Sequence, residues 1–278
     1  MTSNTPVISA KNVWKLFGPD PEGYLAGMKP GMSFDEIRED GYIAGVKDVS
    51  IEVSRGEMLV IMGLSGSGKS TIIRHVNRLI EPTDGQVFVE GRNITDLNTA
   101  DLRELRARKI GMVFQHMALW PHKTIAENVG FGLKVQKVSR ENRRQAAEDA
   151  LARVGLAGWG ERYPDELSGG MQKRVSLARA IAAEPQIIFF DEPTTGLDPI
   201  MSGVINRLIR EIVTEMGATA LTITHDMSSV RAIADRVAML HAGKIRWEGP
   251  VSEMDAATDP YLTQFISGSA DGPIETLR

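Results

Sequence analysis

The chain has 278 residues, of which 42% are hydrophobic and 24% charged, so it can bury the core of one large domain or of a domain with a subdomain. Its net charge of −4 gives no sign of a nucleic-acid-binding surface, and the lack of cysteine excludes disulfides, cysteine-ligated zinc and iron–sulfur clusters. Since no apolar run is long enough to span a bilayer and the N-terminus lacks a signal-peptide layout, we expect the chain to stay in the cytosol.

The first predicted elements are two strands separated by an insertion. Residues 7–13 alternate apolar and polar side chains as a strand does, and residues 49–53 resume the alternation. The intervening residues 18–44 are rich in glycine and proline, although Ser33 is placed to cap a short helix over residues 33–37. We therefore predict an insertion between two strands.

An apolar strand over residues 58–62 leads into a glycine-rich loop. Residues 63–71 fit the pattern G-x-x-x-x-G-K-[ST] without a mismatch, and helical spacing follows over 71–80. Such a loop points successive backbone N–H groups into one concavity, and the helix N-terminus adds partial positive charge. This concavity suits a polyphosphate, with Lys69 reaching the β and γ phosphates and the Ser70 hydroxyl ligating Mg²⁺. The alternative, a simple turn before a helix, leaves the strand, the spacing and the Lys-Ser pair unexplained. The predicted nucleotide-binding residues here are Gly63, Leu64, Ser65, Gly66, Ser67, Gly68, Lys69, Ser70 and Thr71.

The middle of the chain changes from mixed to helical patterning. Residues 86–90 are predicted as a strand, 101–108 as a helix, and 110–114 as a buried strand that ends at Gln115. From 124 to 155 the spacing is helical, which indicates a mostly helical subdomain between two βα halves. It includes a basic run from Arg140 to Arg144, which we interpret as a solvated helix face rather than a nucleic-acid site.

Helices and strands alternate through the rest of the chain. The predicted helices cover residues 171–183, 199–216 and 227–234, and the predicted strands cover 187–190, 218–223, 237–241 and 245–248. This alternation predicts an α/β fold with a mainly parallel sheet, whose strand carboxyl ends hold the ligand. The apolar strand over 187–190 ends in the carboxylates of Asp191 and Glu192. Asp191 is placed to orient Mg²⁺ through water, and Glu192 to polarise the water that attacks the γ phosphate.

Several motifs in order resemble the ATP-binding subunits of ABC transporters. These are the phosphate loop, Gln115, the segment Leu167-Ser168-Gly169-Gly170-Met171, the pair Asp191-Glu192, the segment Gly196-Leu197-Asp198, and His225. The resemblance covers nearly the whole chain and implies a single P-loop ATPase domain over residues 1–278. Within it the resemblance implies an antiparallel β subdomain, the insertion at 18–44, a helical subdomain at 116–166 and a C-terminal tail at 250–278.

The resemblance also implies a head-to-tail homodimer with two shared ATP sites. Ser168, Gly169 and Gly170 would contact the γ phosphate bound to the partner, through N–H groups at a helix start. Asp198 would bridge the two sites, and His225 would hold the γ phosphate. Gln115 would ligate Mg²⁺ and sense the attacking water, so the implied catalytic residues are Glu192, His225 and Gln115, and the implied metal ligands are Ser70, Gln115 and Asp191.

Two details of the motifs are less regular. Phe17 is our choice for the aromatic residue that stacks on adenine, with Trp14 as the competitor and core packing as the alternative for both. Met171 stands where the family's signature segment usually has Gln, which affects only the expected contact with the partner's nucleotide.

Two segments of the chain resemble ATPases that transport different cargoes. Residues 16–166 resemble the ATPases of glycine betaine/proline osmoprotectant importers, whereas residues 185–278 resemble those of phospholipid-trafficking systems of the Mla/Mce type. A chimera and a natural intermediate member both fit this pattern. We give the first segment more weight, because the helical subdomain is where such ATPases contact the membrane subunits, and we predict glycine betaine/proline-type uptake.

Partners follow from the same resemblance. We expect transmembrane permease subunits, a substrate-binding protein and a peripheral location on the cytoplasmic face of the membrane. Residues 116–122 are the predicted docking surface, with exposed apolar side chains. A chromosome-maintenance or repair ATPase is the alternative from another class, but it needs a long coiled coil, and no sustained heptads separate the motifs.

Overall fold

The computed structural model describes residues 5–29 and 31–274, and the chain divides into two compact units. The first unit comprises residues 1–97, 223–230 and 234–278, and the second comprises residues 98–222 and 231–233. Residues 1–4, 30 and 275–278 lie outside the described part, and they include the end of the C-terminal tail predicted at 250–278.

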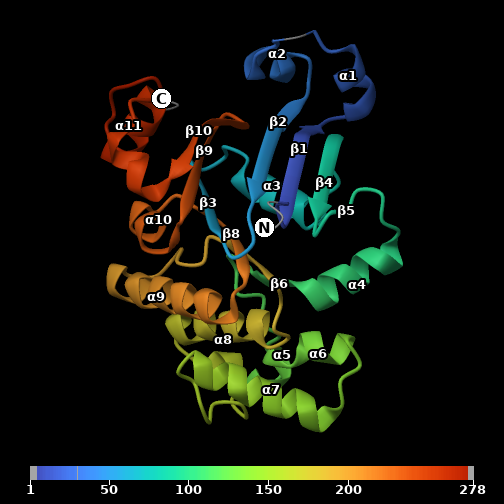
Figure 1. Ribbon diagram of the computed structural model, residues 1–278, viewed down its shortest axis with the longest axis vertical. Coiled ribbons are helices and arrows are strands. Elements are labelled where there is room, and N and C mark those ends of the chain that lie inside the picture. The colour runs from blue at the N-terminus through green and yellow to red at the C-terminus, as the bar shows by residue number, and fades with distance from the viewer. Residues whose placement is uncertain (1–4, 30, 275–278) are drawn as a thin grey trace. The chain divides into compact units, whose positions relative to one another are not determined.

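The first unit contains an antiparallel sheet of order β2-β1-β4-β5. Its strands are β1 (Ile8–Phe17), β2 (Ile43–Val53), β4 (Asp84–Val89) and β5 (Arg92–Asn93), and β1, β2 and β4 lie side by side in Figure 1. Side chains along β2 alternate between buried and exposed from Val49 onward, as expected for a sheet with one covered face. The antiparallel subdomain that the family resemblance implied is therefore confirmed.

A second set of strands in this unit carries the phosphate loop. β3 (Met58–Met62) pairs in parallel with β9 (Arg236–His241), which pairs antiparallel with β10 (Lys244–Pro250). All five residues of β3 are buried, as expected for a strand covered on both faces. The chain then enters α3 (Lys69–Val76), which begins earlier and ends earlier than predicted because Gly68 starts it and Asn77 terminates it.

The insertion forms two short helices rather than one. α1 (Pro21–Gly27) was missed from the sequence, although Asp20 accepts a hydrogen bond from Gly23 N–H and Pro21 occupies the first turn. This Asp-Pro pair is the usual signal for a helix start and could have identified α1. α2 (Phe34–Glu39) begins at the predicted cap, where Ser33 and Glu36 form a capping box.

The insertion is tied to the strands beside it. Because β1 ends at Phe17 and β2 begins at Ile43, it spans residues 18–42 rather than the predicted 18–44. The rings of Tyr24 and Tyr42 stack at 4.1 Å, and the Tyr24 hydroxyl donates to Asp40 at 2.7 Å. Lys47, which is 5% exposed, donates its Nζ to the Met32 carbonyl.

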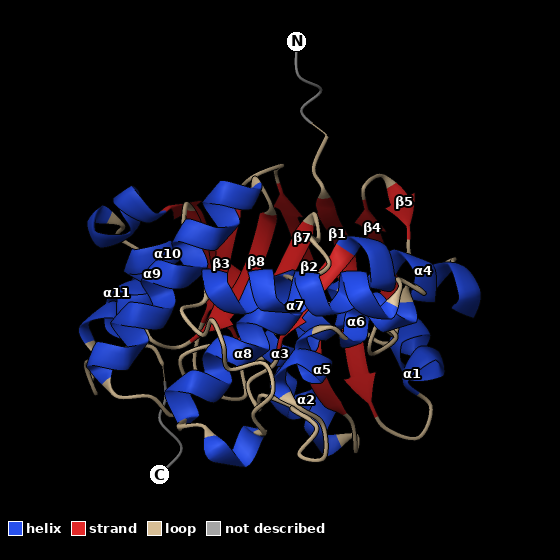
Figure 2. Cartoon of the chain, turned by 90° about the horizontal axis from the view of Figure 1, so that it is seen from below, coloured by secondary structure: helices blue, strands red, loops and turns tan. Residues whose placement is uncertain are grey.

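The second unit joins a set of strands to a group of helices. Its elements are α4 (Thr99–Lys109), β6 (Ile110–Val113), α5 (Ile125–Val129), α6 (Phe131–Val135), α7 (Arg140–Arg153), the 3₁₀ turn η1 (Pro164–Glu166), α8 (Gly169–Ile181), β7 (Ile187–Asp191), α9 (Pro199–Met216) and most of β8 (Thr219–Thr224). The strand order is β8-β7-β6, with β6 and β7 parallel. Helices α5, α6 and α7 lie next to one another in both Figure 1 and Figure 2.

The remaining elements follow β8. α10 (Met227–Ile233) begins in the first unit, and β10 is followed by the 3₁₀ turn η2 (Val251–Ala256) and α11 (Pro260–Ser267). α11 was also missed, and it begins with another Asp-Pro pair, in which Asp259 caps the helix. Among residues 5–29 and 31–274, none of the helices combines the length and apolar character needed to cross a membrane.

Candidate nucleotide site

The predicted site residues fall into two sets, one in each unit. The first unit holds Phe17, residues 63–71 and His225. The second unit holds Gln115, Ser168, Gly169, Gly170, Asp191, Glu192 and Asp198.

The phosphate loop has the backbone that only glycine adopts without strain. Gly63, Gly66 and Gly68 have φ angles of 153°, 77° and 103°. A Cβ added to Gly63 would lie 2.1 Å from the Leu240 carbonyl oxygen, and one added to Gly68 would lie 2.1 Å from the Gly45 carbonyl oxygen. The loop is therefore held closely against its neighbouring backbone, and its shape requires these glycines.

Two polar side chains of the loop support an anion site. Lys69 is 6% exposed, and its Nζ donates to the carbonyls of Gly63 and Leu64 at 2.7 Å each. These carbonyls hold the ammonium at the loop, at the N-terminus of α3. The Ser67 hydroxyl is buried and has no hydrogen-bond partner among the described residues, so the loop contains a polar group that a phosphate oxygen would satisfy.

Phe17 lies beside the loop. It is 42% exposed, and the Lys15 ammonium lies 5.2 Å from the centre of its ring. A Cβ built on Gly45 would lie 3.0 Å from the Phe17 ring and 3.5 Å from the Thr71 methyl group, so all three residues meet at the start of α3. The exposed ring of Phe17 next to the phosphate loop is compatible with adenine stacking, and the competitor Trp14 is half-buried. Adenine stacking by Phe17 stays a prediction.

His225 follows the last residue of β8 and is exposed. Its neighbour Asp226 caps α10 by accepting from the backbone N–H groups of Ser228 and Ser229. The sequence position predicted for His225, directly after a strand, is thus correct, and its contact with a γ phosphate stays a prediction.

The carboxylate pair of the second unit lies at the end of a fully buried strand. Asp191 is 1% exposed and Glu192 is 7% exposed. Glu192 has a φ of 51°, a left-handed conformation that non-glycine residues adopt only when the surroundings impose it. The Thr195 hydroxyl donates to Glu192 Oε2 at 3.1 Å, which helps to orient the carboxylate.

A buried cation lies near this pair. Lys173 of α8 is 3% exposed, and its Nζ donates to the Gln115 carbonyl at 2.7 Å. Burial lowers the pKa of the Lys173 ammonium, while the charges of Asp191 and Glu192 oppose that shift. Sequence patterning did not identify Lys173, because a lysine two positions after the signature segment reads as an ordinary helix residue.

The signature segment forms the start of α8. The Ser168 hydroxyl accepts from the Met171 N–H at 3.4 Å, while Ser168 and Gly169 are exposed. The N–H groups of the first turn of a helix lack intrahelical partners, so this exposed turn is suited to an anion. Asp198 also caps a helix, because its Oδ1 accepts from the N–H groups of Ile200 and Met201 at 2.9 Å. Contacts of these residues with a second subunit stay predictions.

The predicted ligands suit Mg²⁺ by their chemistry. The Ser70 hydroxyl, the Gln115 amide oxygen and the Asp191 carboxylate are hard oxygen donors, which Mg²⁺ prefers. Among the described residues, no group of three or more His, Cys, Asp or Glu side chains could hold a metal ion.

The predicted docking surface at residues 116–122 differs from expectation. Met117, Leu119 and Trp120 are half-buried rather than exposed. The Trp120 ring packs on Phe131 at a centroid distance of 4.3 Å, and Arg179 lies 5.7 Å from its centre. The prediction of exposed apolar side chains was wrong, and for Trp120 the cause is its packing on Phe131 of α6 and Arg179 of α8.

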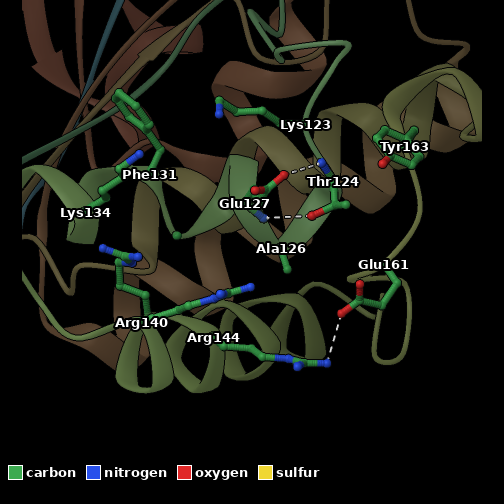
Figure 3. Close-up of a pocket in the computed structure, with 12 residues that line it drawn as sticks. Lys123, Thr124, Ala126, Glu127, Phe131, Lys134, Arg140, Arg144, Glu161 and Tyr163 are labelled. Atoms are coloured by element: carbon green, nitrogen blue, oxygen red, sulfur yellow. Dashed lines mark hydrogen bonds and ion pairs between the residues drawn. The ribbon is translucent and has the colours of Figure 1, made fainter.

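A cavity of about 450 Å³ lies in the same unit, between α5, α6 and α7. Five cations and two carboxylates line it, namely Lys123, Lys134, Arg140, Arg143 and Arg144 with Glu127 and Glu161. Figure 3 shows Lys134 and Arg140 on one side, with Glu161 and Tyr163 on the other. Arg144 pairs with Glu161 at 2.9 Å, but the side chains of Lys123, Lys134 and Arg140 have no ion pair within the described residues. The basic run interpreted as a solvated face therefore contributes to a positively charged pocket.

Comparison with known proteins identifies close relatives. Residues 46–195 match the family model described as "ABC transporter". The trimethylamine N-oxide transport system ATP-binding protein TmoW of Ruegeria pomeroyi is 51% identical over 94% of this chain and 77% of its own length. The glycine betaine/proline betaine transport system ATP-binding protein ProV of Escherichia coli is 41% identical over 94% of this chain and 66% of its own length. The glycine betaine transport ATP-binding protein OpuAA of Bacillus subtilis is 41% identical over 93% of this chain, which spans 62% of that protein.

These alignments run through both segments of the chain. The resemblance of residues 185–278 to phospholipid-system ATPases is therefore a minor part of its relationships. The chain spans less than two thirds of the length of ProV and OpuAA.

Solved structures agree with the predicted fold class. A dimeric ATP-binding cassette, in a post-hydrolysis state with ADP and phosphate, matches with a TM-score of 0.74 and 33% identity, over 88% of this chain and 98% of its own. The protein cbiO1 of Clostridium perfringens, described as part of an ABC transporter complex, matches with a TM-score of 0.75 and 26% identity, over 92% of each chain.

Proposed function

Because the chain belongs to the ABC transporter family and is an ATPase of that family, we propose that it powers the uptake of a small methylated amine. Candidate cargoes are glycine betaine or proline betaine, which are quaternary amines, and trimethylamine N-oxide. The observation that carries the proposal is the high identity, over almost the whole chain, to ATPases of transport systems for these compounds.

We assign the nucleotide chemistry to the residues of the predicted motifs. Lys69 and the backbone of residues 63–68 hold the β and γ phosphates of ATP. Ser70, Gln115 and Asp191 would hold Mg²⁺, which would supply positive charge against the phosphate oxygens. Glu192 polarises the attacking water, and His225 orients the γ phosphate. The rigid strand end and imposed backbone of Glu192 support its role as the general base.

ABC ATPase cassettes form dimers and work with transmembrane permease subunits, and the chain acts in such an assembly. The exposed first turn of α8 at Ser168 supports a shared site, because the first N–H groups of a helix have no carbonyl partner within it, although Met171 N–H donates to Ser168. Closure of a dimer around ATP would move the permease subunits, and hydrolysis would reset them. A substrate-binding protein delivers the cargo from outside, so the chain lies on the cytoplasmic face of the membrane.

The positively charged pocket of the helical segment is the proposed permease contact. It carries five cationic and two anionic side chains in a chain whose net charge is −4. Unpaired cations at a cavity attract an acidic partner, and Lys134 and Arg140 at one rim provide them. We therefore assign this pocket to an acidic cytoplasmic segment of the permease, in place of an apolar surface at 116–122.

The test is to purify the chain with permease subunits from a methylated-amine importer and, separately, from a phospholipid transporter. We expect ATP hydrolysis to be stimulated and coupled to uptake only with the former. Reversing charge with Arg140→Glu should weaken stimulation, while Arg55→Glu, outside the pocket, serves as the control. Stimulation by the phospholipid permease alone would overturn the cargo, and an equal effect of both substitutions would overturn the docking assignment.

A further inference from the structure

Helix α8 carries two cations that hold the same loop. Lys173 Nζ donates to the Gln115 carbonyl at 2.7 Å. Six residues further along the helix, Arg179 donates from Nη1 to the Ala118 carbonyl and from Nη2 to the Met117 carbonyl, both at 2.7 Å. The two side chains thus bind three carbonyls within four consecutive residues.

The loop that they hold has little freedom of its own. Ala118 has a φ of 50°, a left-handed conformation that requires external support in a residue with a Cβ. Beyond it, the buried Asn128 accepts from Trp120 N–H and donates to the carbonyls of Trp120, Lys123 and Thr124. The loop is therefore fixed at its end by α5, and α8 fixes its beginning.

Because Lys173 is buried, its charge must be compensated by the groups around it. An ammonium that is only 3% exposed needs compensation, and its hydrogen bond to Gln115 with the nearby charges of Asp191 and Glu192 supplies it. An apolar residue would fill the same volume without holding Gln115. The charge therefore serves the loop rather than the packing of the helix.

We propose that Lys173 is a positioning residue for Gln115, and that Lys173 and Arg179, here called the α8 clamp, make the signature helix and residues 115–120 move as one body. The proposal rests on the proposed ATPase role of Gln115. Movement of residues 115–120 would then carry the signature segment at the start of α8 with it. Lys173 holds the loop at Gln115, and Arg179 holds it at Met117 and Ala118.

The clamp is tested first without nucleotide. Amide hydrogen exchange over residues 115–120 is measured in the purified chain and in Lys173→Met, Arg179→Met and the control Lys137→Met, which changes an exposed lysine of the same unit. We expect faster exchange near Gln115 in Lys173→Met and near Ala118 in Arg179→Met, and no change in the control. Unchanged exchange in both clamp variants would overturn the proposal.

Hydrolysis separates positioning from general loss of structure. In Lys173→Met we expect kcat to fall by about tenfold or more, because a small misplacement of Gln115 is costly, while KM for ATP changes by less than about twofold. Lys173→Arg, which keeps a charged donor, should restore part of kcat. If Lys173→Met does not fold, Lys173→Gln replaces it, since it keeps a donor without the charge.

A double-mutant cycle tests whether Lys173 affects hydrolysis through Gln115. With the Gln115 side chain removed by Gln115→Ala, the further change Lys173→Met should have little effect on kcat. Additive losses would show that Lys173 acts elsewhere and would overturn its positioning role. If Gln115→Ala and Glu192→Gln both hydrolyse ATP normally, the proposed function fails, while hydrogen exchange still decides whether the clamp exists.

Discussion

At the scale of single residues, Glu192 is the position on which hydrolysis depends most. We expect Glu192→Gln to lower kcat by about 100-fold or more, because general-base catalysis contributes 10²–10⁴-fold. ATP binding should persist, since the phosphate loop is untouched. Steady-state hydrolysis and binding of a fluorescent ATP analogue measure the two effects, and a normal turnover rate would refute the assignment.

His75 predicts how stability varies with pH. Its Nδ1 donates to the Ile80 carbonyl at 2.8 Å, whereas Nε2 is buried without a hydrogen-bond partner in the described part of the chain, so the folded state favours the neutral ring. Burial lowers the pKa of His75 from 6.5. Below pH 6.5 the unfolded chain binds this proton more readily, so the contribution of His75 to stability is full above that pH and is lost as the pH falls.

The comparison is urea unfolding of the wild-type chain and of His75→Gln at pH 7.5 and pH 5. We expect the wild-type chain to lose more stability between these values than the variant. An equal loss in both proteins would show that His75 does not drive this pH dependence.

At the scale of elements, one buried lysine helps to hold the insertion in place. Lys47 donates to the Met32 carbonyl and lies 5.4 Å from the centre of the Phe34 ring. Lys47→Met should lower the free energy of unfolding by about 1–3 kcal/mol, the range for leaving a buried polar group unsatisfied. Limited proteolysis should then cut within residues 18–42, whereas Lys11→Met, on the surface, should leave the insertion protected. Identical cleavage of both variants would contradict this role for Lys47.

Periodicity predicted elements well where local signals agree with packing. β3 and α9 have the predicted bounds, because uniform burial in one and an amphipathic pattern with Asp198-Pro199 in the other leave little choice. α1 and α11 have only seven and eight residues, and the signal that indicates each is the Asp-Pro pair at its start rather than periodicity. β5 has only two residues, Arg92 and Asn93, and forms because β4 offers it a partner, which no local pattern indicates.

The candidate site was predictable where chemistry sits in a contiguous motif. The phosphate loop has the expected glycine-dependent backbone, and Asp191-Glu192 ends a buried strand as expected. The α8 clamp was not predictable, because the contact of Lys173 with Gln115 joins residues 58 positions apart. Tertiary contacts of this kind depend on packing that a single sequence does not encode locally.

At the scale of the whole molecule, the division into two units bears on assembly. The phosphate loop belongs to one unit and the signature segment to the other, and the family's cassettes form dimers. We expect Glu192→Gln to form a dimer with ATP, because it retains binding and does not hydrolyse the nucleotide. Size-exclusion chromatography with light scattering measures the mass with and without ATP.

The matched control for assembly is the double variant Lys69→Ala, Glu192→Gln. It lacks the ammonium that reaches the phosphates and should remain a monomer at the same ATP concentration. A dimer that forms equally well without ATP, or in the double variant, would contradict a nucleotide-dependent interface.

The left-handed backbone at Glu192 lowers folding stability at the residue that is needed for activity. Holding a non-glycine residue there costs about 1–3 kcal/mol, a sizeable part of the 5–15 kcal/mol by which a typical domain is stable. Glycine at this position would relax the backbone and would be preferred by a selection for thermal resistance alone. Engineering that raises stability without monitoring turnover would therefore tend to remove the group that performs the reaction.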